Sequence, residues 1–70
     1  MDTILWKSKN SHWYVIKTTY PDQSFSIYPA RWIERKTPDG AISHWADATW
    51  DAPDYVLIKA GVIARKEARK

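Results

Sequence analysis

The stretch RWIERKTPDGAISHW, residues 31–45, decides the fold, because it predicts a β-hairpin on local grounds alone. Two runs that contain aromatic and β-branched side chains flank Thr37-Pro38-Asp39-Gly40. Proline suits the first central position of a type I turn, and glycine suits the left-handed position that follows. We therefore expect strands at 31–36 and 41–45, joined by a type I turn with a bulge.

The alternation of side chains along a strand sets the two faces of this hairpin. One face of the first strand carries Arg31, Ile33 and Arg35, and the other face carries Trp32, Glu34 and Lys36. Trp45, on the second strand, either pairs with Trp32 across the hairpin or lies on the opposite face. The sequence leaves both arrangements open.

Three more strands are expected before the hairpin, at residues 3–7, 12–19 and 23–28. The second is rich in aromatic and β-branched residues, and the third alternates Phe25 and Ile27 with serines. Turn chemistry separates them, and Pro29 is expected to end the third strand.

A C-terminal helix is predicted from Asp51-Ala52-Pro53-Asp54, with Asp51 as N-cap and proline in the first turn. We expect this helix from about Ala52 to Ala60, with an extension past Gly61 or a terminal strand as the alternatives. The predicted fold is α+β: a small antiparallel, partly barrel-like sheet of four or five strands and one C-terminal helix. Residues 1–64 form the expected single domain, and residues 65–70 form a basic tail.

This layout, with short strands followed by Asp51-Ala52-Pro53 at a helix start, resembles the small SH3-like DNA-binding chromatin proteins of archaea. The resemblance is one of architecture and implies an SH3-like sheet. No binding residue of this chain can be assigned from the resemblance. Residues 1–58 are also more acidic than those strongly basic proteins.

Composition narrows the function classes. The 70 residues contain no cysteine, which excludes disulfides, cysteine zinc sites and thiol catalysis and favours a cytoplasmic location. No apolar run approaches the roughly 20 residues that span a bilayer. The two histidines, His12 and His44, have no partner at a catalytic or metal-ligand spacing. We therefore expect no enzymatic activity, no metal and no cofactor.

Five tryptophans in so short a chain predict a binding surface, because a small core cannot enclose them all. Trp6 and Trp13 are expected in the core, and Trp50 is expected to pack at the helix entrance. Trp32 and Trp45, on a hairpin with basic residues, are the predicted surface aromatics.

Charge makes nucleic acid the preferred partner, since aromatic rings stack on bases and basic side chains contact phosphates. The predicted interface joins the hairpin to the basic C-terminus and consists of Arg31, Trp32, Arg35, Lys36, Trp45, Lys59, Arg65, Lys66, Arg69 and Lys70. The alternative is a protein partner that docks on exposed Trp, Tyr and Arg, as in a small inhibitor of mobile-element origin. A homodimer through the same surface belongs to this alternative.

Overall fold

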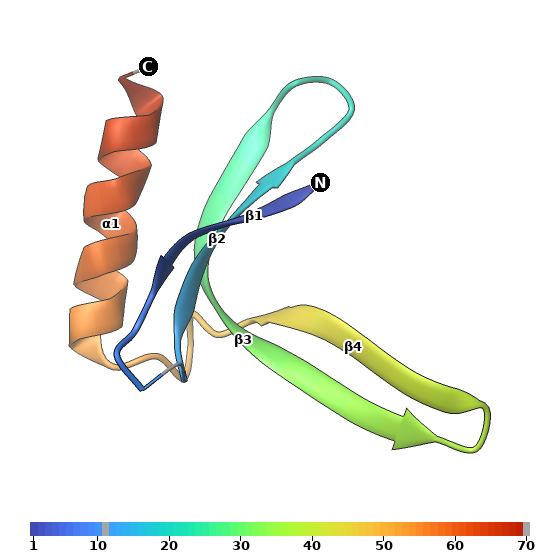
Figure 1. Ribbon diagram of the computed structural model, residues 1–70. Helices are drawn as coiled ribbons and strands as arrows, with labels where there is room; N and C mark the ends of the chain where they lie inside the picture. Colours follow the sequence, from blue (N-terminus) through green and yellow to red (C-terminus); the bar gives the residue numbers. More distant parts are fainter. Residues whose placement is uncertain (11, 70) are drawn as a thin grey trace.

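A computed structural model describes residues 1–10 and 12–69 of the chain. Its elements are β1 (Asp2–Lys7), β2 (Tyr14–Thr19), β3 (Phe25–Thr37), β4 (Gly40–Asp47) and α1 (Asp54–Ala68). The strands form one antiparallel sheet in the order β1-β2-β3-β4, and α1 lies along one side of it (Figure 1). The α+β class is thus confirmed, with four strands.

The sheet stays open instead of closing into a barrel, since β1 and β4 are its two edges in the part of the chain that is described. Its curvature comes from β3, which is 13 residues long and bends sharply near its middle (Figure 1). The first part of β3 pairs with β2, and the second part pairs with β4. Ala30 is the shared point, because it lies opposite both Tyr14 and Asp47.

Pro29 does not end a strand, so this prediction was wrong. It lies inside β3, opposite Val15 of β2, and its carbonyl accepts a hydrogen bond from the N–H of Ala48 at 2.9 Å. The nitrogen and oxygen of one strand residue face the same neighbour. The N–H that proline lacks would therefore point past the end of β4, and the pairing with β2 is left intact.

The helix begins later and runs further than the preferred prediction of 52–60. Its N-cap is Pro53, not Asp51, and no side chain caps it. It continues through Gly61 to Ala68, so Arg65 and Lys66 of the expected basic tail lie within it. In the described part of the chain, no helix combines the length and apolar character needed to cross a membrane.

The part of the core between α1 and the sheet is small, and Ile16 of β2, which is also fully buried, lies on the other face of the sheet because it alternates with Val15. Val56 and Ala60 of α1 are buried, as is Val15 of β2. An ion pair at 3.1 Å between Lys17 Nζ and Glu67 Oε2 ties β2 to the last turns of α1. The helix therefore covers the face of the sheet that carries Val15 and Lys17, which lie on alternate positions of β2.

No tryptophan is fully buried. Trp6 and Trp13 are half-buried, so their assignment to the core was wrong. Trp50 is 96% exposed and does not pack at the helix entrance. Small and β-branched side chains fill the core instead, and the indoles lie around it.

Candidate functional site

The distal half of the β3–β4 hairpin extends from the body as a two-stranded ribbon (Figure 1). Its pairs run from Arg31 opposite Ala46 to Thr37 opposite Gly40, and β2 does not pair with them because it begins at Tyr14, opposite Ala30. Gly40 has a φ of 136°, so the predicted need for glycine at the turn is confirmed. The ribbon therefore presents both faces and both edges.

An aromatic row crosses the base of this ribbon. Trp32 lies directly opposite Trp45, with ring centroids 4.8 Å apart at an angle of 66°. Trp45 in turn meets Tyr14 of β2 edge to face, at 4.8 Å and 68°. We call Tyr14, Trp45 and Trp32 the aromatic row. The structure thus answers the open question of register: the two tryptophans form a cross-strand pair.

The outer end of the aromatic row is accessible but held in place. Trp32 is 44% exposed, and its indole N–H donates to Glu34 Oε1 at 3.1 Å. Residues two positions apart on a strand lie on the same face, which is why Glu34 can reach the indole of Trp32. Edge-to-face packing against Trp45 and this hydrogen bond to Glu34 restrict the orientation of the Trp32 ring.

The aromatic row lies on the face of the sheet opposite α1. Tyr14 alternates with Val15, and Val15 and Lys17 share the helix-covered face. Arg31 lies on the same face of the sheet as Val15, because it is two positions after Pro29, the residue opposite Val15. The Arg31 guanidinium lies over the Trp13 ring, 5.3 Å from its centroid. Arg31 therefore supports the opposite face and does not flank Trp32.

The predicted interface residues consequently fall into separate groups. Lys36 shares the face of Trp32, whereas Arg31 and Arg35 share the other face of the ribbon. The exposed basic residues of the C-terminal segment are Lys59, Arg65, Lys66 and Arg69, and all of them lie on or just after α1, away from the aromatic row. Lys70 lies outside the described residues.

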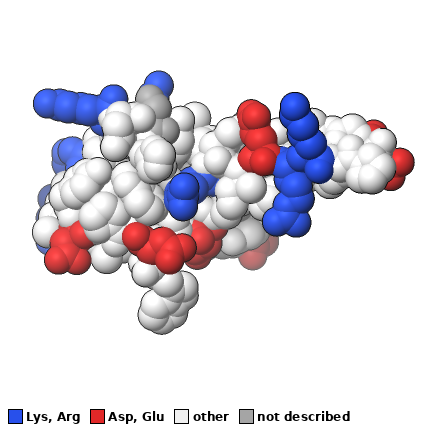
Figure 2. Space-filling view, turned by 90° about the horizontal axis from the view of Figure 1, so that it is seen from below, with Lys and Arg blue, Asp and Glu red and all other residues white. Residues whose placement is uncertain are grey.

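The face around the aromatic row has little positive charge. The strand pairing and the alternation of side chains place two cations on this face, Lys7 and Lys36. The same face carries three carboxylates, those of Asp2, Glu34 and Asp47. Seen from below, the molecule likewise shows basic and acidic groups side by side (Figure 2). The strand residues of this face therefore carry no excess of positive charge.

Trp50 is an exposed aromatic that sequence reasoning assigned to packing. It lies in the turn after β4, where buried Ala48 accepts hydrogen bonds from the N–H groups of Asp51 at 3.1 Å and Ala52 at 2.8 Å. The available signal was the absence of large apolar residues in the flanking Asp-Ala-Thr and Asp-Ala-Pro segments. An indole without large apolar neighbours in the sequence has little to pack against locally.

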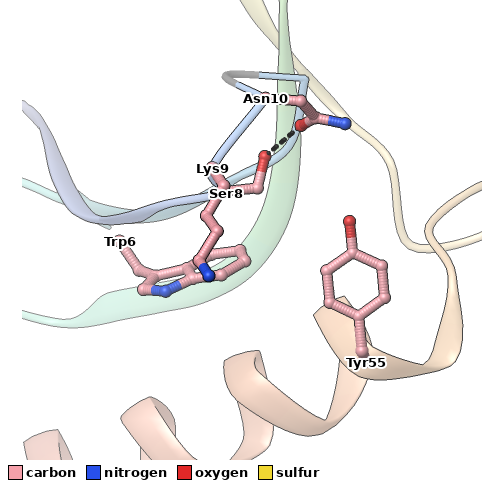
Figure 3. A pocket seen from close by; sticks show the side chains of 5 residues that line it. All are labelled: Trp6, Ser8, Lys9, Asn10 and Tyr55. Atoms are coloured by element: carbon pink, nitrogen blue, oxygen red, sulfur yellow. Dashed lines mark hydrogen bonds between the residues drawn. The ribbon is translucent and has the colours of Figure 1, made fainter.

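A pocket of about 410 Å³ lies between the end of β1 and the first turn of α1. Trp6 and Tyr55 stand at its two sides, with the loop of Ser8, Lys9 and Asn10 above (Figure 3). Ser8 Oγ donates to Asn10 Oδ1 at 2.7 Å and accepts the N–H of Trp13 at 3.1 Å. The polar groups of this pocket thus serve the loop itself.

In the part of the chain that is described, no three His, Asp or Glu side chains gather as metal ligands would. The exposed features of the described residues are the aromatic row, the free strand edges and the outer side of α1. No protein-family model, curated protein or solved structure matches the chain.

Proposed function

We propose that the chain is a non-enzymatic binding module that takes a protein partner on the aromatic row. The observation that carries the proposal is the edge-to-face contact between Trp45 and both Tyr14 and Trp32, with Trp32 still 44% exposed. Trp and Tyr dominate the energetics of protein interfaces. Side chains that are ordered before binding lose less conformational entropy when a partner arrives.

The free edge of β4 suggests the form of the partner. Gly40–Asp47 is an edge strand of eight residues without Lys, Arg or Pro, the residues that usually discourage strand addition. An extended segment can add to such an edge through main-chain hydrogen bonds and place alternate side chains against the sheet. We therefore infer a partner segment in β conformation, with apolar side chains that reach Trp32 and Trp45.

Charge supports a protein over a nucleic acid at this face, because carboxylates outnumber cations around the row. Nucleic acid remains a second candidate at another place, the outer side of α1. There Lys59, Arg65, Lys66 and Arg69 are all exposed. The resemblance to SH3-like DNA-binding chromatin proteins is consistent with this second candidate. We propose a cytoplasmic location for the protein in both cases.

Selection from a displayed library of extended peptides tests the first candidate. Peptides enriched on the wild-type protein should lose about 30-fold or more in affinity for Trp32→Ser, the loss of a hot-spot residue worth roughly 2 kcal/mol. Trp50→Ser is the matched control, because it removes an exposed indole that is not part of the aromatic row, and it should bind as wild type does. If no peptide is enriched, or if Trp32→Ser binds normally, the proposal fails.

A titration with single- and double-stranded DNA and RNA at several salt concentrations tests the second candidate. Phosphate contacts predict an affinity that falls steeply with salt, by about 0.9 log units per log unit for each phosphate neutralised on B-DNA. Lys66→Gln should reduce this slope, and Lys36→Gln should not. Absence of binding at low salt would eliminate nucleic acid.

A further inference from the structure

The outer side of α1 carries large apolar side chains beside its charged ones, where a single surface helix would be polar. Tyr55, Ile58 and Val62 all face solvent, and Ile58 is 67% exposed. The sheet-facing side of the helix carries Val56 and Ala60 instead. The helix therefore has large apolar side chains on a side that its own sheet does not cover.

Four residues form an outer stripe along this side: Asp54, Ile58, Gly61 and Arg65. They are spaced four, three and four positions apart, which places them in one line on a helix. All four are exposed, and neither Asp54 nor Arg65 forms an ion pair within the described residues. The stripe begins with the acidic Asp54 and ends with the basic Arg65. Between them lie the large side chain of Ile58 and Gly61, which has no side chain.

This order is self-complementary when the stripe is reversed. If a second helix runs antiparallel to the first, Asp54 of one copy lies opposite Arg65 of the other. In the same register, Ile58 of one copy lies opposite Gly61 of the other. Each charge then meets its opposite, and each bulky side chain meets a position without one.

Gly61 supports this arrangement independently of the charges. Glycine disfavours a helix interior, and a Cβ added at Gly61 would meet nothing within 4 Å. The fold of one chain therefore gives no steric reason for glycine here. A second helix that packs over this position does give one, because the distance between two helix axes depends on the side chains at the contact.

We propose that two copies of the chain associate through the outer stripe of α1 as an antiparallel, two-fold symmetric helix pair. One helix pair is at the small end of protein interfaces, below about 1,200 Å² of total buried surface. The dimer is accordingly weak and reversible, with a dissociation constant of about 10 µM to 1 mM. This surface is distinct from the aromatic row and does not depend on its function.

Sedimentation velocity of the full chain from about 10 µM to 1 mM, at low salt, provides the test. The wild-type protein should change from monomer to dimer over this range. Asp54→Arg and Arg65→Asp should each remain monomeric, since each places like charges opposite one another. Their equimolar mixture should dimerise again, because every Arg then faces an Asp. Asp39→Arg, at the exposed hairpin turn, is the control and should dimerise as wild type does.

Gly61→Gln provides a second variant that keeps the helix. Its side chain enters open space in the monomer and has a higher helix propensity, so circular dichroism should show unchanged folding. Dimer affinity should fall at least tenfold. A wild-type protein that stays monomeric at about 1 mM would overturn the proposal, as would a charge-swapped mixture that does not associate. Binding of a persistent monomer to phosphatidylserine vesicles would assign the stripe to a membrane surface and also overturn it.

Discussion

The contact between Trp32 and Trp45 can be measured as a coupling energy, and its size follows from the geometry. The rings meet edge to face at 4.8 Å across a direct strand pair. Such aromatic pairs contribute about 0.5–1.5 kcal/mol beyond their area burial. Val is the suitable replacement at both positions, because it keeps the β propensity of the strands.

The single substitutions should differ in cost. Trp45 is half-buried and contacts two rings, so Trp45→Val should destabilise the fold by about 2–3 kcal/mol. Trp32 is more exposed and contacts one ring, so Trp32→Val should cost about 1–2 kcal/mol. The double variant should be less destabilised than the sum of the singles by the coupling energy.

Urea unfolding followed by far-ultraviolet circular dichroism measures all four proteins without relying on indole fluorescence. Trp32 and Trp50 form the control cycle, because Trp50 is 96% exposed and is not part of the aromatic row, so their substitutions should add within about 0.3–0.5 kcal/mol. A coupling between Trp32 and Trp45 below that level would refute the reasoning. The aromatic row would then not be an ordered surface before binding.

Three further outcomes are expected. Ser8→Ala should lose about 1–3 kcal/mol of unfolding free energy in urea, because it strands a backbone N–H in the loop after β1. Glu67→Gln should cost about 0.5–1 kcal/mol, measured in the same way, and less in high salt, because the pair with Lys17 is partly exposed. The pKa of Asp22 should lie below its ordinary value of 3.8 in an NMR titration, since the hydroxyl and the N–H of Ser24 donate to its carboxylate, and Ser24→Ala should raise it. The stabilisation from this carboxylate is present above pH 3.8 and is lost as the pH falls through the lowered pKa.

The hairpin could be predicted from sequence because its signals are local. Pro38 and Gly40 specify the turn, and period-two alternation specifies the strands on each side. Pro29 could not be read correctly in the same way. A strand can contain this proline only if the proline nitrogen faces away from a strand that needs its N–H. The sheet topology decides which neighbour the nitrogen faces.

The orientation of the helix was also beyond local reasoning. Tyr55, Ile58 and Val62 have helical spacing, but so do Val56 and Ala60, and only packing on β2 and β3 decides which set is buried. The smaller side chains face the sheet and let the helix approach it closely.

The candidate site was predicted in part. The sequence singled out Trp32 and Trp45, and the strand pairing brings them together. It also assigned Arg31 and the basic residues of the C-terminal segment to the same interface, whereas the curvature of β3 and the position of α1 separate them. Membership in one surface depends on tertiary arrangement, which residue spacing does not encode.

The central claim is that the aromatic row and the edge of β4 form one binding surface for an extended protein segment. NMR chemical-shift mapping of the ¹⁵N-labelled protein with a library-selected peptide tests it most directly. We expect the largest changes at the indole N–H groups of Trp32 and Trp45 and at the backbone amides of Gly40–Asp47. Changes confined to α1, with both indoles unaffected, would contradict the account.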